Sequence, residues 1–336
     1  MAVVEQNISG VKLEKMRKRV CRLTFLAIKG AKAVFAMGVV VTLFRQRHFI
    51  RYIAEGHWQA AIGAGAMAAG GLMLSFCVAA AFYAVCSMLF WSRSYNLFNQ
   101  NYKNKYVLTK MRETPGFSEL KYTAGRGLPF GGIAKAKLLP VSSETYFKSK
   151  DYFEGVYDRI RFCSGSVETF DTASAATLFE GQVIIFSAFH EFKISETPVQ
   201  IFSSKESGKM KGRTLPHKIE TENAAFNRKF SVFAEDGHTA FYILTPQVLE
   251  DITEFAGLFP GATYMAFAGE SMYVGCAQLH NPFDAFVDVP VEEQSANIKK
   301  AAEVIRKARD IMIDIGRREG ENAQDGANCH AQRILR

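Results

Sequence analysis

The side chains that could form a metal site or an acid–base site are few and scattered. Four histidines, His190, His217, His238 and His280, lie between residues 151 and 316 of the 336-residue chain. None belongs to a His-x-x-x-His motif or stands at metal-ligand spacing from a cysteine, so we expect no metal site. His190 and Glu191 are neighbours, but on a strand they would point to opposite faces, which argues against a shared imidazole–carboxylate site.

The sequence also lacks a local signature for a nucleophile. It has no Gly-x-Ser-x-Gly motif, and no basic motif near Cys163 or Cys276 would stabilise a thiolate. Asp236 and Asp251 do not form a paired-carboxylate motif. We therefore predict a protein that is not an enzyme, with no catalytic, cofactor-binding or metal residues and no cofactor. The enzymatic alternative is a site assembled from residues far apart in the sequence.

Two glycine-containing stretches carry lysines that could bind a phosphate. Gly131–Gly132 precedes Lys135 and Lys137, and a second stretch is Ser207–Met210. Neither ends in the Gly-Lys-Ser/Thr sequence of a phosphate-binding loop, so a plain surface loop is the favoured interpretation of both.

One stretch organises the rest of the chain. From Trp58 to Trp91 the sequence contains no Asp, Glu, Lys, Arg or His. Because a helix rises about 1.5 Å per residue, roughly 20 apolar residues cross the hydrocarbon core of a membrane. The stretch is longer than that requirement and Arg93 follows it, so we predict a transmembrane helix over about residues 66–91.

A first apolar segment runs from Leu23 to Phe44, but only its second half, from Ala33 on, is free of charge. Lys29 and Lys32 share a helical face near the basic end, from which their long side chains can reach the headgroups. We therefore favour a membrane-spanning helix over residues 23–44 rather than an amphipathic helix at the interface. The brief connection Arg45–His57 makes the two segments a helical hairpin.

Small residues form two rows on the second segment: Ala60, Ala64 and Ala68, and Ala61, Gly65 and Ala69. Small side chains four residues apart let helices approach closely in lipid. The rows predict a packing face for the first segment or for a second protomer. The alternative is that Ala and Gly only fill a permissive helix.

The formal charge of +8 is concentrated beside the apolar segments. Bases crowd before the first segment and after the second: Lys12, Lys15, Arg17, Lys18, Arg19, Arg22, Arg93, Lys103, Lys105, Lys110 and Arg112. This is the pattern of cytoplasmic flanks, so we place both termini in the cytoplasm, provided that the first segment spans. No nucleic-acid-reading motif accompanies the charge, and we expect no nucleic acid as a partner.

The cysteines and the N-terminus agree with this location. The six cysteines contain no Cys-x-x-Cys pair, which is typical of a reducing compartment rather than of a disulfide framework. The N-terminal apolar region starts late and is interrupted by lysines, so it does not resemble a cleaved signal peptide.

The second half of the chain alternates short strands with turns. We predict strands over Val156–Phe162, Gln182–Phe189, Thr263–Phe267 and Ser271–Ala277. Asp236–Gly237 between the apolar runs Phe230–Ala234 and Thr239–Leu244 predicts a β-hairpin. Thr245–Pro246 predicts the start of a helix that ends near Phe255, and helical spacing of apolar residues predicts an amphipathic helix over Glu292–Ile315.

These elements predict an α+β fold: an N-terminal transmembrane helical hairpin followed by a β-rich soluble domain with a C-terminal amphipathic helix. We expect a basic cytoplasmic N-terminus (1–22), a membrane section (23–92), a juxtamembrane connector (93–150), a cytoplasmic α+β domain (151–316) and a disordered tail (317–336). Phenylalanines scattered along the strands are interpreted as core: Phe179, Phe186, Phe189, Phe192, Phe202, Phe226 and Phe230.

Several blocks resemble a bacterial membrane-protein family known as domain of unknown function 3137. The central block comprises Phe226–Val232, Glu235–Asp236, Ala240–Pro246 and Leu249–Glu250. Flanking motifs are Phe179–Gly181, Met272–Val274 and Pro282–Phe283, so the likeness covers roughly residues 152–288. The resemblance implies two membrane segments followed by a cytoplasmic α+β domain, and it implies no catalytic residues.

We therefore expect a membrane-anchored cytoplasmic domain that binds or scaffolds a protein partner, or self-associates, at the bacterial inner membrane. One alternative is binding of anionic lipid headgroups by the basic juxtamembrane surface. Another is a membrane-tethered enzyme with a dispersed site. The predicted location is the inner membrane, multi-pass, with the lipid bilayer itself as a partner.

Overall fold

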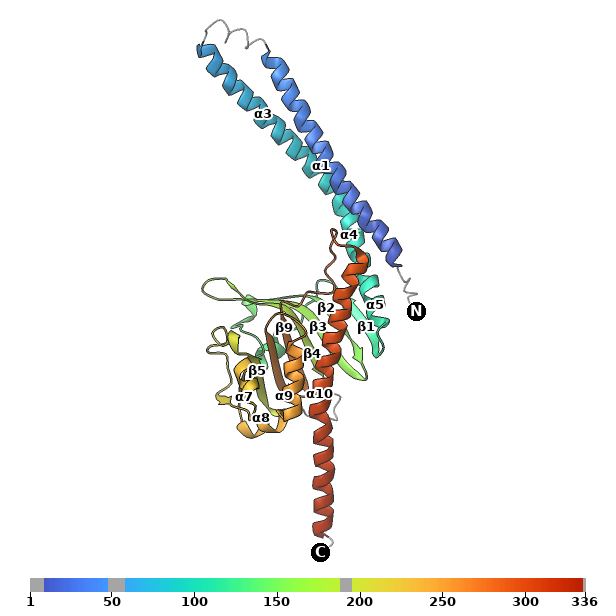
Figure 1. Cartoon of the computed structure of the whole chain (residues 1–336), viewed down its shortest axis with the longest axis vertical. Helices are drawn as coiled ribbons and strands as arrows, with labels where there is room; N and C mark the ends of the chain where they lie inside the picture. The colour runs from blue at the N-terminus through green and yellow to red at the C-terminus, as the bar shows by residue number, and fades with distance from the viewer. Residues whose placement is uncertain (1–8, 48–57, 188–194, 335–336) are drawn as a thin grey trace. The chain divides into compact units, whose positions relative to one another are not determined.

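The computed structural model describes residues 9–47, 58–187 and 195–334. The chain forms two compact units (Figure 1). One contains Met1–Tyr106 together with Ala285–Gln294, and the other contains Val107–Asp284 together with Ser295–Arg336. The second unit is the β-rich domain, and each unit is described by itself.

The first unit is built on two long helices. Helix α1 (Gly10–Gln46) begins after Ser9, whose Oγ accepts a hydrogen bond from Val11 N at 3.3 Å. Helix α3 (Trp58–Cys86) continues through a π-helical turn, Ser87–Trp91, into α4 (Ser92–Asn101). Both predicted apolar segments are therefore helical, and both helices extend beyond the predicted bounds.

Glycines set the close approach of α1 and α3. A Cβ on Gly38 would lie 2.3 Å from Ser75 Oγ, and a Cβ on Gly71 would lie 2.7 Å from Thr42 Cγ2. The buried Ala79 extends this contact face along α3. Such close contact between small residues is how helices associate where lipid removes the hydrophobic driving force.

The predicted small-residue rows coincide with this face only in part. Ala68 is half-buried beside it, whereas Gly65 and Ala69 are exposed and do not face α1. The side chains of Ala60, Ala61 and Ala64 lie outside the described residues.

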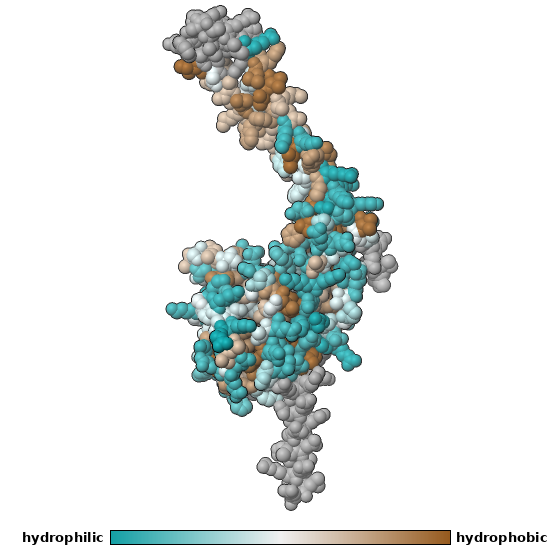
Figure 2. Space-filling model, in the orientation of Figure 1, coloured by the Kyte–Doolittle hydropathy of each residue, from teal (hydrophilic) through white to brown (hydrophobic). Residues whose placement is uncertain are grey.

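The two helices present apolar side chains outward. Exposed large hydrophobic residues include Phe25, Leu26, Met37, Val40, Val41, Leu43 and Phe44 on α1, and Ile62, Met73, Leu74, Phe76 and Val85 on α3. Figure 2 shows this hydrophobic colouring along the pair. Apolar surface this extensive marks an interaction site rather than a water-exposed face. Both helices are long and apolar enough to cross a membrane, as the sequence predicted.

An ion pair ties the base of α1 to residues 285–294. Arg17 binds Glu14 through two hydrogen bonds, at 2.8 and 2.6 Å, and also donates to Val287 O at 2.7 Å. The Glu14 carboxylate accepts a hydrogen bond from Val291 N, at the first residue of α10, at 3.2 Å. These bonds, with Arg17 foremost, lower the pKa of Glu14 from 4.5 to about 2. Both residues precede the apolar segment 23–44.

The second unit is a nine-stranded antiparallel sheet in the order β1-β2-β3-β4-β9-β8-β5-β7-β6. The strands are β1 (Phe117–Thr123), β2 (Phe147–Tyr157), β3 (Ile160–Phe170), β4 (Thr177–Ser187), β5 (Ser195–Ser203), β6 (His217–Ile219), β7 (Phe230–Ala234), β8 (Thr263–Gly269) and β9 (Ser271–Ala277). The helices are α5 (Leu108–Arg112), α6 (Phe130–Lys135), α7 (Ala224–Lys229), α8 (Gly237–Ile243), α9 (Pro246–Ala256) and α10 (Val291–Ile334).

Alternating side chains give the sheet two buried faces. On one face Val183 of β4 and Tyr264 of β8 join a cluster with Ile133 of α6. On the other, Ile184 of β4 lines a cavity of about 20 Å³ with Ile305 of α10. Helices α9 and α10 lie side by side and are linked by an ion pair between Lys307 and Glu254 at 2.6 Å (Figure 1).

Several predicted elements are confirmed. Strands β7, β8 and β9 contain the predicted runs, and β8 and β9 are joined by a turn at Gly269, whose φ is 61°. Strand β4 contains residues 182–187 of the predicted strand Gln182–Phe189, and the last two residues lie outside the described ones. Helix α9 begins after Thr245 with proline at its start and ends at Ala256. Of the phenylalanines interpreted as core, those within the described residues are buried, while Phe189 and Phe192 lie outside them.

The predicted hairpin after β7 is wrong. Residues 237–243 form helix α8, and Asp236 is its N-cap, accepting hydrogen bonds from Thr239 N at 2.9 Å and His238 N at 3.3 Å. These bonds lower the pKa of Asp236. The predicted strand Val156–Phe162 is likewise two strands, because Asp158 and Arg159 make a turn with φ of 46° and 73°.

The structure also differs from the expected connector and tail. Strand β1 and the first residues of β2 lie within 93–150, so part of that stretch belongs to the sheet. Helix α10 continues to Ile334, through most of the stretch expected to be disordered.

We predict that Glu14→Ala loosens the tie at the base of α1. Val291 N loses its acceptor and Arg17 loses its carboxylate, so amide exchange of residues 287–291 should rise roughly tenfold or more at pH 7. Hydrogen exchange of the full chain in detergent measures this. A matched control is Glu113→Ala, which removes an exposed ion pair with Lys110 and should leave the segment unchanged.

The same tie should depend on pH. Because the pKa of Glu14 is lower in the folded chain, its stabilising effect is present above 4.5 and is lost as the pH falls toward 2. After correction for intrinsic exchange, the difference between wild type and Glu14→Ala should shrink over that range. A difference that stays constant from pH 6 to pH 3 would contradict the assignment.

Candidate ligand-binding site

The candidate site is a cavity of about 520 Å³ in the β-rich domain, which we call the basic pocket. Its wall combines α6, the segment that follows α6, and the turn after Met210. The lining residues are Phe130, Ala134, Lys137, Leu139, Val141, Ser142, Lys211, Gly212 and Arg213. Both glycine- and lysine-containing stretches noted in the sequence therefore contribute to one site or border it.

The end of α6 places Lys137 at the pocket. Lys137 N bonds to Ala134 O at 3.0 Å and Leu138 N bonds to Ile133 O at 3.2 Å, the hydrogen bonds of a Schellman motif. The motif requires a left-handed residue, and Lys137 has a φ of 49°. Glycine usually takes this position, and a side chain there costs roughly 1–2 kcal/mol. The surrounding structure must therefore hold Lys137 in place.

One buried amide holds both walls. Gln200, on β5, is 1% exposed. Its Nε2 donates to Lys137 O at 2.5 Å and to Arg213 O at 3.4 Å. Its Oε1 accepts from Leu215 N at 3.2 Å. A single side chain thus fixes the backbone of both segments that carry the cations, although they are far apart in the sequence.

The electrostatics of the pocket favour an anion. Its lining includes three cations, Lys137, Lys211 and Arg213, and no acidic side chain among the described residues that form it. Two acids lie near the lining segments in the sequence. Glu144 is exposed and does not line the pocket, and Glu206 already bonds to Lys209 at 2.9 Å and accepts from Tyr264 OH at 3.0 Å. Neither acid lines the pocket, so the three cations give its opening a positive field.

The rest of the lining is apolar. Leu139 is 2% exposed, and Phe130 packs on the Phe147 ring with centroids 5.4 Å apart. Val141 completes this wall. The arrangement can hold an anionic group beside an apolar one, and its lining groups are binding groups rather than a nucleophile with a base.

A second, smaller cavity of about 230 Å³ lies over β1, β2 and β3. It contains Cys163 and Tyr152, whose OH donates to Glu154 Oε2 at 2.9 Å. Burial raises the pKa of Cys163 to about 11 and also raises the pKa of Tyr152. The thiol is therefore protonated at neutral pH and is a poor nucleophile.

The other candidate residues from the sequence, Cys276 and the histidines, do not come together in one site among the described residues. Cys276 is fully buried, and burial raises the pKa of its thiol. His217, His238 and His280 are exposed and line none of the cavities described above, while His190 lies outside the described residues. Over the residues that the structure describes, no group of His, Cys, Asp or Glu could hold a metal.

Residues 169–316 match the model of a family described as "Protein of unknown function (DUF3137)". This confirms the resemblance drawn from the sequence blocks. The match includes Lys211 and Arg213 but begins after the α6 side of the pocket, Phe130–Ser142. No curated protein matches the chain significantly.

We predict that Gln200→Met disorders the basic pocket. The change leaves two carbonyls and one N–H without their partner, which costs roughly 1–3 kcal/mol for each buried group left unsatisfied. Amide exchange at residues 136–138 and 213–215 should therefore rise, measured on the full chain in detergent.

A matched control is Gln182→Met. Gln182 is 5% exposed on β4, and its Nε2 has no partner among the described atoms. Removing it should cost less than removing Gln200 and should leave exchange in both pocket segments unchanged. Equal effects of the two substitutions on these segments would show that Gln200 has no special role.

Proposed function

We propose that the protein is a membrane-anchored binding domain. The helices α1 and α3 hold it in the bacterial inner membrane, with both termini in the cytoplasm, and the basic pocket binds an acidic segment of a partner protein. The observation that carries the proposal is the pairing, in one cavity of about 520 Å³, of three cations with an apolar wall.

An acidic polypeptide fits both features of the pocket. Its carboxylates would meet Lys137, Lys211 and Arg213, and a neighbouring apolar side chain would pack on Phe130 and Leu139. Lys137 and Lys211 are exposed, so their ammonium groups are hydrated in the unbound protein. Their charges attract an acidic partner over about a Debye length. Binding of this kind weakens with salt.

The location rests on the charge around the first apolar segment. Lys12, Lys15, Lys18, Arg19 and Arg22 are exposed on α1, whereas Arg17 is buried and paired with Glu14. Exposed bases beside a membrane helix favour the cytoplasmic side.

The same exposed bases support a second candidate function, binding of anionic lipid headgroups at the membrane surface. Each base near an anionic surface contributes roughly 1 kcal/mol. We rank it second because bases beside a membrane helix are already explained by the orientation of the anchor, so they need no separate lipid-binding function.

We predict that charge reversal in the pocket abolishes binding of acidic peptides. The full chain is placed in nanodiscs of zwitterionic lipid. Fluorescent peptides carrying Asp and Glu beside Phe and Leu are compared with Asn and Gln counterparts. Wild type should prefer the acidic set, and the triple variant Lys137→Glu, Lys211→Glu, Arg213→Glu should bind it at least roughly tenfold more weakly.

The control triple variant is Lys229→Glu, Lys299→Glu, Lys300→Glu. These lysines are exposed on α7 and α10, do not line the basic pocket, and change the net charge by the same amount. The control should retain affinity within about twofold. Equal losses in the two triple variants, or equal affinity for the amide peptides, would overturn the proposal.

A further inference from the structure

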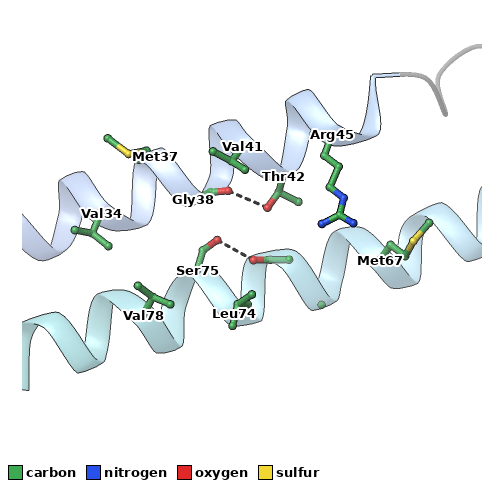
Figure 3. A pocket seen from close by; sticks show the side chains of 12 residues that line it. Val34, Met37, Gly38, Val41, Thr42, Arg45, Met67, Leu74, Ser75 and Val78 are labelled. Carbon is green, nitrogen blue, oxygen red and sulfur yellow. Dashed lines mark hydrogen bonds between the residues drawn. The ribbon is translucent and has the colours of Figure 1, made fainter.

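The hairpin carries a groove that none of the preceding functions uses. The groove has a volume of about 690 Å³ and lies between α1 and α3. Half of its lining residues have large apolar side chains: Val34, Met37, Val41, Met67, Leu74 and Val78. Figure 3 shows these residues along the two helices, with Arg45 extending from α1 toward α3 at one end.

The polar groups of the middle of the groove are already satisfied. Thr42 Oγ1 donates to Gly38 O and Ser75 Oγ donates to Gly71 O, each at 2.8 Å within its own helix (Figure 3). An apolar ligand would therefore meet methyl and methylene groups on this wall, and the hydroxyls of Thr42 and Ser75 are already hydrogen-bonded. Gly70 has no neighbouring atom within 4 Å of where its Cβ would lie, which leaves the floor of the groove open.

Arg45 gives the groove a charged end. It is the last groove residue of α1, and none of the described residues that line the groove is acidic. Its side chain makes no ion pair or hydrogen bond with the part of the chain that the structure describes. An arginine at the edge of the hydrocarbon region is stable only when its charge meets water or an anion, and a phosphate suits the guanidinium fork.

The length of the groove favours a lipid of one leaflet over a transmembrane helix of a second copy. Val34 to Arg45 on α1 and Met67 to Val78 on α3 are each 11 residues apart, about 17 Å of helix. This is close to half of the roughly 30 Å hydrocarbon core, the depth that one leaflet supplies. A transmembrane helix of a second copy would need a groove that continues through both leaflets.

We propose that the groove binds one anionic phospholipid, with an acyl chain between α1 and α3 and its phosphate on Arg45. The lipid belongs to the leaflet on the side of the connection between the two helices. The net charge of the headgroup provides the selectivity, because a zwitterionic lipid brings its own cation beside Arg45. The site is independent of the basic pocket.

Native mass spectrometry of the full chain, purified in detergent with equal amounts of phosphatidylglycerol and phosphatidylcholine, measures the lipid retained. Wild type should retain phosphatidylglycerol in preference. Arg45→Gln should lower that preference at least roughly fivefold, toward equal retention. The matched control is Arg47→Gln, since Arg47 stacks on Phe44 and does not line the groove.

A second pair of variants tests the groove itself. Gly70→Leu adds a side chain at the floor, where a Cβ meets no described atom within 4 Å, and it should reduce retention of both lipids. Gly65→Leu, which also meets no atom within 4 Å and lies outside the groove, should not. Equal losses in Arg45→Gln and Arg47→Gln would overturn the proposal. So would undiminished lipid in Gly70→Leu, or a dimer that Gly70→Leu disrupts while lipid retention stays unchanged.

Discussion

The structure depends first on the need of the α1–α3 pair for an apolar solvent. Their backbone groups bond within each helix, and large side chains such as Phe25, Met73 and Phe76 face outward. Water would make that surface an aggregation site, whereas lipid accepts it without cost. The contact between the helices is consequently made by small residues, Gly38 and Gly71, rather than by a hydrophobic core. The β-rich domain follows the opposite rule and buries its apolar side chains on both faces of the sheet.

Several buried polar side chains in this protein fix the position of distant backbone segments or side chains, whereas the exposed cations are available for binding. Asp151 is 4% exposed, and it accepts hydrogen bonds from Tyr122 OH and from Asn281 Nδ2. Gln200 and the Glu14–Arg17 pair are used in the same way, each fixing backbone from a distant part of the chain. Such groups are costly unless every partner is present, so they specify a single arrangement. In contrast, Lys137 and Lys211 of the basic pocket are exposed to solvent, as are Lys12, Lys15, Lys18, Arg19 and Arg22 of α1.

The parts of the fold that the sequence predicted are those with unambiguous local signals. The charge-free run Trp58–Trp91 predicts a membrane helix by itself, and Thr245–Pro246 predicts the start of α9. The Asp236–Gly237 pair is ambiguous, because aspartate caps a helix as readily as it forms a turn. The pairing of β7 favours the helix. Strand β7 is already paired with β5 on one side and β6 on the other, so residues 239–244 cannot pair with it as a hairpin strand. The basic pocket is also beyond local patterns, because Gln200 on β5 joins the segments that carry Lys137 and Arg213, which are far apart in the sequence.

The most direct test of the account is the side of the membrane on which the β-rich domain lies. An epitope is fused after Arg336, and antibody binding is measured on sealed bacterial spheroplasts before and after permeabilisation. Antibody should bind only after permeabilisation, because an even number of crossings keeps the domain with the basic N-terminal flank in the cytoplasm. Binding to sealed spheroplasts would contradict it, and the basic pocket would then face the wrong compartment for the proposed partner.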